Sequence, residues 1–226
     1  MSYYIGLSFL SNMSSTRTKG TKLTDEARRI LSQLEERHIH ENDIAREPNG
    51  RPFFPDREGT DFNISHSGAL AAVSYARGGN LRTGCDVERL RLRPKTTKIA
   101  EKLFSVSEQN YIFSQPEYTE ARFFEIWTLK ECYIKLRGLS VFDMASTPSF
   151  VRNNALAFDA AVSSPLSFIL YELSDSGERY ILSAALEGPE QHQPIIRWFS
   201  ESSLPCKIIA EIKAAPNPAE TVKPNR

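Results

Sequence analysis

The first half of the chain alternates short apolar runs with turn residues. Residues 3–10 form an apolar run of strand length, and the polar, glycine-containing stretch 11–22 predicts a loop. Thr24 is suited to begin a helix as its N-cap, and apolar residues then recur every three or four positions up to Leu34. Strand-like runs follow at 61–66, 69–77 and 81–90. We therefore expect one helix and several antiparallel strands in this half.

The second half begins with helical patterns and ends with strand-like runs. Ser105-Val106-Ser107-Glu108 and Ser114-Gln115-Pro116-Glu117 both have the spacing of a capping box, in which serine and glutamate side chains bond free N–H groups of a helix start. Residues 117–137 repeat apolar positions at helical spacing, and Gly138 is placed to end that helix. Strand-like runs lie at 149–152, 166–173, 180–186 and 195–199.

Both halves thus have the same coarse content, a helix together with antiparallel strands. This content predicts an α+β fold of two similar lobes. The basic stretch 89–95 is the candidate linker, so we expect an N-terminal lobe over 1–93 and a C-terminal lobe over 94–213. The tail 214–226 is rich in Pro and Ala without periodicity, and it is predicted to be disordered.

Composition excludes several classes of function. The 226 residues contain 28 Lys and Arg and 28 Asp and Glu, and this balance argues against a protein that coats nucleic acid. No apolar run approaches the roughly 20 residues of a membrane span, and the first residues lack the pattern of a secretory signal. The three cysteines form no Cys-x-x-Cys pair, which disfavours zinc. We expect a monomer in the cytoplasm with neither nucleic acid nor membrane as a partner.

Asp86 and Glu88 are the first candidate functional residues. They are separated by one residue in a predicted strand, so their side chains point to the same face with Cα atoms roughly 6–7 Å apart. Two neighbouring carboxylates repel each other unless a cation or a proton lies between them. A hard divalent ion such as Mg²⁺ suits oxygen ligands and leaves positions open for phosphates. A solvated strand edge would produce the same pattern.

Glu131 and Lys135 form a second group, because residues four apart are neighbours on one helix surface. A surface ion pair is the alternative interpretation. With Lys130 nearby, however, Glu131 could complete an acidic site whose lysines neutralise phosphate charge. Such a site acts on a phosphate ester or anhydride: metal polarises the phosphoryl oxygens, lysine neutralises charge, and a carboxylate takes the proton of the nucleophile.

Asn63-Ile64-Ser65-His66-Ser67 is a third group, in which a histidine lies between two serines. A Ser/His hydrolase is not expected, because no Gly-x-Ser-x-Gly elbow surrounds the serine. His66 is better suited to donate to a phosphate or carbonyl at a strand end. A turn histidine satisfied by local backbone is the alternative.

Taken together, these segments resemble the 4′-phosphopantetheinyl transferases of the larger, Sfp-type group. The family's marks are Asn-Ile-Ser-His-Ser, Gly-x-Asp-x-Glu and Trp-x-x-Lys-Glu-x-x-x-Lys, and they occur here in that order at 63–67, 84–88 and 127–135. Gly50-Arg51-Pro52 also fits an upstream mark, and the resemblance extends over about 50–139. It implies a pseudo-dimer of two α+β lobes with the active site in their cleft. The implied reaction transfers phosphopantetheine from coenzyme A to a serine of an acyl or peptidyl carrier protein.

The resemblance also implies a role for each matching position. Asp86, Glu88 and Glu131 resemble the ligands of Mg²⁺, for which Mn²⁺ can substitute. Glu131, or a metal-bound water near it, resembles the base that deprotonates the carrier serine. Lys135 resembles the residue that contacts the phosphates of coenzyme A and protonates the leaving adenosine 3′,5′-bisphosphate.

Further positions are implied to bind coenzyme A. His66 and Arg51 resemble contacts to its 3′-phosphate end, with Ser65 nearby, and Lys130 is expected to add a cation for the phosphates. Glu108 resembles the last residue of the family's Phe-Ser-x-x-Glu. The stretch 27–32 departs from the family pattern, which leaves the adenine contacts unassigned.

Two other functions use similar residues. A metal-dependent nuclease or phosphodiesterase also uses acidic pairs, but the neutral charge and the Glu-x-x-x-Lys spacing count against it. A non-catalytic module that binds carrier proteins is the second, and the presence of all three carboxylates with Lys135 counts against that. The apolar residues after the long helix, Phe142 and Met144 among them, are expected to contact the carrier or to pack the lobe interface.

Overall fold

Two four-stranded sheets form the centre of the computed structural model, which describes residues 2–10, 19–91, 95–175, 177–189, 192–200 and 203–216. The first sheet has the order β11-β1-β5-β4, and the second has the order β12-β9-β10-β6. The first sheet comprises β1 (Ser2–Phe9), β4 (Thr60–Ser67), β5 (Leu70–Arg77) and β11 (Ile195–Trp198). The second comprises β6 (Arg82–Arg89), β9 (Leu166–Asp175), β10 (Glu178–Glu187) and β12 (Cys206–Ala214). Paired strands are antiparallel except β1 and β11, which are parallel.

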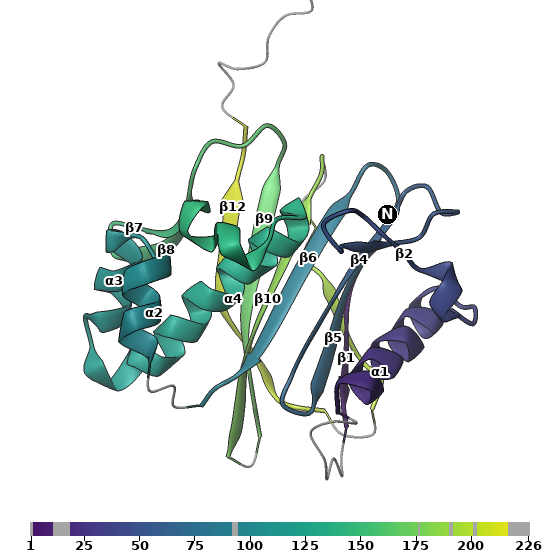
Figure 1. The fold of residues 1–226 in the computed structure, drawn as a ribbon, viewed down its shortest axis with the longest axis horizontal. Helices are drawn as coiled ribbons and strands as arrows, with labels where there is room; N and C mark the ends of the chain where they lie inside the picture. Colours follow the sequence, from purple (N-terminus) through teal and green to yellow (C-terminus); the bar gives the residue numbers. More distant parts are fainter. Residues whose placement is uncertain are drawn as a thin grey trace, which may run out of the picture.

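The sheets pack face to face between two long helices, α1 (Lys19–Leu34) and α4 (Thr119–Arg137) (Figure 1). Side chains of the two inner sheet faces, such as Leu7 and Leu182, share one buried cluster. The outer face of the first sheet packs against α1, and the outer face of the second packs against α4. Because both faces of β5 are covered, its residues are buried up to Ala76. The α+β class predicted from the sequence is confirmed.

Helix boundaries differ from the predicted ones at two places. The first helix begins at Lys19 rather than after Thr24, because Leu23 extends the apolar stripe back to the core, where it is 2% exposed. The capping box at Ser105 forms as predicted and begins α3 (Val106–Phe113). The second predicted capping box does not form. The segment Pro116–Tyr118 is instead a 3₁₀ turn (η2), and α4 begins after it.

Gly138 ends α4 in the left-handed conformation, with φ of 66°, as the pattern predicted. Helix α2 (Thr96–Leu103) was not predicted, because its short sequence follows the presumed linker. Strands β8 (Ala155–Asp159) and β12 were also not predicted. In β12 only Ile212 is buried, so the strand lacks a clear alternation of apolar and polar residues. The remaining short elements are β2 (Ala45–Arg46), β3 (Pro52–Phe53), β7 (Ser149–Arg152), η1 (Glu41–Asp43) and η3 (Val141–Ser146).

The two sheets exchange strands across the predicted lobe boundary. Strand β6 precedes residue 93 but joins the second sheet, and β11 follows it but joins the first. The division into 1–93 and 94–213 therefore stays a prediction about chain organisation, as does the similarity of the two lobes. Of the predicted tail, Ala214 ends β12, and 217–226 lie outside the described residues. Within the described part of the chain, each helix is too short or too polar to cross a membrane.

Candidate active site

The site lies where β4, an edge of the first sheet, runs beside β6, an edge of the second. Alternate side chains of β4 accept hydrogen bonds from alternate backbone N–H groups of β6, with donor–acceptor distances of 2.7, 3.4, 3.2 and 3.0 Å. The four pairs are Asp61 with Thr83, Asn63 with Cys85, Ser65 with Val87, and Ser67 with Arg89. We call this set the side-chain ladder. It satisfies the N–H groups of a sheet edge and joins the two sheets.

The serines of the side-chain ladder also orient the two acidic residues of β6. Ser65 Oγ donates to Asp86 Oδ1 at 2.8 Å, and Ser67 Oγ donates to Glu88 Oε2 at 2.8 Å. A serine hydroxyl can donate once and still accept, so each serine serves a backbone N–H and a carboxylate together. Asp86 is 5% exposed, and its second oxygen, Oδ2, is buried without a hydrogen-bond donor among the described residues.

Helix α4 brings Lys135 against this pair. Lys135 Nζ donates to Asp86 Oδ1 at 2.7 Å and to Ser65 Oγ at 3.0 Å. Gly84 permits the close approach of the helix to β6. A Cβ atom at this position would lie 2.6 Å from the backbone oxygen of Cys132 and 3.1 Å from Leu136 Cβ. The glycine of the Gly-x-Asp-x-Glu motif therefore allows α4 to pack closely on β6, independently of any part in a reaction.

Charges in the site perturb one another. Burial and the neighbouring Asp86 raise the pKa of Glu131 to about 7, with Glu88 adding to the effect and Lys135 opposing it. Burial lowers the pKa of Lys135, but the attraction of Asp86 outweighs this and leaves the pKa raised. Partial desolvation and the Lys135 cation lower the pKa of His66. Lys135 therefore stays charged, and the ionised form of Glu131 is disfavoured relative to that of a solvated glutamate.

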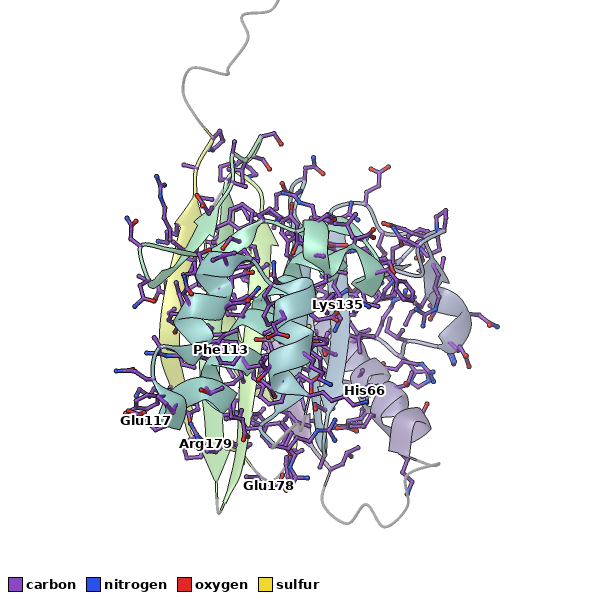
Figure 2. The ribbon with its side chains drawn as sticks, turned by 60° about the vertical axis from the view of Figure 1, so that its left-hand side comes forward. His66, Phe113, Glu117, Lys135, Glu178 and Arg179 are labelled. Carbon is purple, nitrogen blue, oxygen red and sulfur yellow. The ribbon has the colours of Figure 1, made fainter. Side chains whose placement is uncertain are left out.

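These residues line one pocket of about 520 Å³ between the two sheets. Asp86, Glu88, Glu131 and Lys135 lie on its wall together with Ser65, His66 and Arg51. Figure 2 shows Lys135 and His66 at the boundary between the halves of the molecule. A second pocket of about 170 Å³ shares Arg46 and Ile64 with the first and extends it toward Arg28 of α1. Sequence reasoning did not identify Arg46 or the side-chain ladder. The period of two in Asp61-x-Asn63-x-Ser65-x-Ser67 is the signal that could have revealed the latter.

The donor set suits a hard divalent cation, although its atoms are not gathered as ligands. Among the described residues, no three His, Cys, Asp or Glu side chains stand close enough to hold a metal ion together. Asp86 Oδ1 already accepts a hydrogen bond from Lys135 Nζ, and Glu88 Oε2 accepts one from Ser67 Oγ. Nevertheless, three carboxylates border one pocket, and the unpartnered, buried Asp86 Oδ2 is an atom that a cation would satisfy.

Lys130, predicted to bind coenzyme A, lies elsewhere. It is 1% exposed, and its Nζ lies 3.2 Å from Oε2 of the fully buried Glu108. It also donates to Thr147 Oγ1 at 2.9 Å and to the backbone oxygen of Pro148 at 3.2 Å. Adjacent helix residues point about 100° apart, so Lys130 turns into the core where Glu131 turns to the pocket. The pair joins α4 to α3, and Glu108 Oε1 accepts from Phe150 N of β7.

Residues 82–185 match the sequence model of the 4′-phosphopantetheinyl transferase superfamily. The 4′-phosphopantetheinyl transferase psf-1 of Bacillus pumilus is 35% identical over 131 residues, which cover 53% of this chain and 53% of that protein. The transferase AcpT of Salmonella typhimurium is 36% identical over 101 residues, covering 44% and 52%. The transferase pptA of Paxillus involutus is 28% identical over 179 residues, covering 70% and 67%.

The chain thus spans about half the length of the first two of these curated relatives. The matched segment contains Asp86, Glu88, Glu131 and Lys135, and the motif at 63–67 lies before it. The resemblance predicted from the order of the motifs is confirmed: residues 82–185 of this chain are similar to the 4′-phosphopantetheinyl transferase superfamily.

Proposed function

We propose that this protein transfers the 4′-phosphopantetheine group of coenzyme A to a serine hydroxyl of an acyl or peptidyl carrier protein, in a reaction that requires Mg²⁺. The observation that carries the proposal is the contact of Lys135 with Asp86 and Ser65 in a pocket that Glu131 and Glu88 also line. We also propose that the protein belongs to the Sfp-type group and acts as a monomer in the cytoplasm.

The proposed reaction replaces one bond to phosphorus by another. The carrier serine oxygen forms a bond to the phosphorus of phosphopantetheine, and the anhydride bond from that phosphorus to the adenosine bisphosphate breaks. The bond electrons leave with the oxygen of adenosine 3′,5′-bisphosphate, and the serine loses its proton. Mg²⁺ held by Asp86, Glu88 and Glu131 would neutralise phosphate charge. No cysteine or serine of this chain needs to act as a nucleophile.

Glu131 is suited to receive the serine proton. Its carboxyl group lies on the wall of the same pocket as Asp86, Glu88 and Lys135, where a general base within reach of the serine hydroxyl can act directly or through a metal-bound water. Lys135 is suited to stabilise charge on the phosphates, because Asp86 and Ser65 fix its ammonium group while 27% of its side chain remains exposed. A charge held in place within a partly desolvated pocket stabilises a transition state without reorganisation.

The adenosine end of coenzyme A has room in the adjoining pocket. Arg46 borders both pockets and Arg28 borders the second, so two guanidinium groups lie along the extension. Arg46 donates to the backbone oxygen of Gly50 at 2.8 Å, which holds its side chain beside the opening. Guanidinium groups bind phosphate through paired N–H donors. We propose that these two arginines contribute to binding the 3′-phosphate.

The decisive test is the mass of a carrier protein. The protein is incubated with coenzyme A, Mg²⁺ and each of several apo carrier proteins, and the expected result is a gain of one phosphopantetheine on a serine. A Glu131→Gln variant serves as the matched control and should leave the carrier unmodified. Absence of any mass gain across acyl and peptidyl carriers would refute the transferase function. Turnover that persists with excess chelator would refute the requirement for Mg²⁺.

A further inference from the structure

We infer that Arg51 is a positioning residue that fixes the end of α4, and with it Lys135, rather than a ligand of the coenzyme A phosphate. The inference rests on the proposed function for its kinetic consequences. It differs from the contact to the 3′-phosphate that the resemblance implied for this position. It is based on the hydrogen bonds that the guanidinium group of Arg51 makes.

Four hydrogen bonds hold the guanidinium group. Nη1 and Nη2 donate to the two oxygens of Asp61 at 2.8 and 2.6 Å, and Nη2 also donates to the backbone oxygen of Thr83 at 2.8 Å. Nε donates to the backbone oxygen of Lys135 at 3.1 Å. A guanidinium group has five N–H donors in a rigid fork, so four are engaged with protein acceptors. The residue is 6% exposed, and a phosphate contact would require breaking a bidentate pair with Asp61.

The bond from Arg51 to the Lys135 oxygen lies in the last turn of α4. The last four carbonyl groups of a helix lack a partner within the helix. Two residues before the final residue of α4, the Lys135 oxygen receives Arg51 Nε and also the N–H of Gly138, at 3.3 Å. Arg51 therefore fixes the backbone of the residue whose ammonium group lies 2.7 Å from Asp86.

The same guanidinium group is bonded to the first rung of the side-chain ladder. Asp61 Oδ2, which receives Arg51 Nη2, also accepts from Thr83 N at 2.7 Å. Arg51 thus joins β4, β6 and α4 at one point, and these are the elements that carry Ser65, Asp86 and Lys135. Since a catalytic group must be held to within about 0.5 Å of its working position, loosening this point should lower turnover more than substrate binding.

Arg51→Lys separates the two roles. A lysine retains the positive charge that a phosphate requires, but it cannot donate to Asp61, Thr83 and Lys135 together. Asp61→Asn is the companion variant, because it weakens the same arrangement through a residue that the pocket wall does not include. Arg46→Met is the matched control, since Arg46 lines the same pocket and bonds Gly50 rather than α4.

Each variant is assayed with coenzyme A and with 3′-dephospho-coenzyme A, below its measured melting temperature. We expect Arg51→Lys and Asp61→Asn to lower kcat by about tenfold or more, because small misplacements of a catalytic group have effects of this size. Their KM for coenzyme A should stay within about twofold of wild type, and their preference for coenzyme A over the dephospho form should be unchanged. Arg46→Met should instead raise KM and reduce that preference.

Amide hydrogen exchange provides a readout that does not depend on the proposed reaction. In Arg51→Lys and Asp61→Asn, exchange over 135–139 should accelerate, whereas Arg46→Met should leave it unchanged. If the wild-type protein modifies no carrier, the proposed function fails and the exchange result still tests Arg51. Unchanged exchange in a folded Arg51→Lys, unchanged kcat in Asp61→Asn, or a selective loss of preference for coenzyme A in Arg51→Lys would each overturn the positioning role.

Discussion

Lys135 and Asp86 lie 49 residues apart in the chain, and their charged atoms meet at 2.7 Å on the wall of the pocket. Ser65 bonds to both partners of this contact, because its Oγ donates to the same Asp86 oxygen and accepts from Lys135 Nζ. A lysine fixed in this way presents its charge to the pocket in one orientation. The arrangement couples the edge of one sheet, the edge of the other and the last turns of α4.

Removing the Lys135 charge should abolish most of the activity. Lys135→Met is expected to lower kcat for carrier modification by about 100-fold or more, since fixed charges that stabilise a phosphoryl transition state have effects of this order. Lys135→Arg should recover part of the loss, because it restores the charge with a different geometry. Steady-state kinetics with coenzyme A and an apo carrier protein measures both. Near-wild-type turnover by Lys135→Met would show that Lys135 has no role in the reaction.

The raised pKa of Glu131 predicts a pH-dependent stability in protein treated with chelator. Between its ordinary pKa and the folded value of about 7, the folded state holds a proton that the unfolded state has lost. The contribution of Glu131 to the free energy of unfolding should therefore fall as pH rises from about 4.5 to 7. Urea denaturation of wild type and Glu131→Gln across this range checks the sign. The difference between the two proteins should change in favour of the glutamine variant with increasing pH, and a constant difference would contradict the raised pKa.

Gly84→Ala should disturb the packing of α4 on β6. The added Cβ would lie 2.6 Å from a backbone oxygen, which cannot move without shifting the helix. Overpacking of this kind costs about 1–3 kcal/mol, and the shift should also move Glu131 and Lys135 and lower kcat. Gly177→Ala is the control, because its space is open and only its φ of 90° opposes the change. Equal kinetics for the two variants would show that the Gly84 contact does not position the helix.

Lys130→Met should destabilise the fold without weakening coenzyme A binding. It leaves the fully buried Glu108 without its cation, and breaking a buried ion pair in this way costs about 3–5 kcal/mol. Replacing Glu108 by Gln in the same protein should return part of the loss, because the uncompensated charge is removed. Chemical denaturation gives the stability, and calorimetric titration of folded protein gives the affinity. A large loss of affinity for coenzyme A at unchanged stability would restore the predicted binding role of Lys130.

Phe142 should contribute to carrier recognition. It is 91% exposed in η3, just after the pocket residues Gly138 and Leu139, and Ser140 Oγ accepts from its backbone N–H. Phe142→Ala should raise KM for the carrier about tenfold and leave KM for coenzyme A unchanged, as expected for an anchoring aromatic residue. Ile208→Ala, 47% exposed on β12, is the control. Of the two roles expected for Met144, its full burial favours packing in the core over contact with the carrier. Equal carrier KM values for the two variants would contradict a docking role for Phe142.

The sequence by itself determined most of the local elements and indicated which candidate site residues share a face. Short strand-like runs between turn residues revealed β1, β5 and β6, and apolar positions at helical spacing revealed α4. The acidic pair and the Glu-x-x-x-Lys spacing similarly indicated residues that share a face. Strand β12 and helix α2 left little pattern, since one is largely exposed and the other short.

Only the tertiary structure decided which residues meet across long distances in the chain. The side-chain ladder pairs residues 22 apart, and β11 returns to the first sheet beside β1. Adjacent residues of a helix point in different directions, so Lys130 turns into the core while Glu131 and Lys135 face the pocket. Such choices depend on how apolar faces of distant elements pack together, and that packing energy is not contained in any local run of residues.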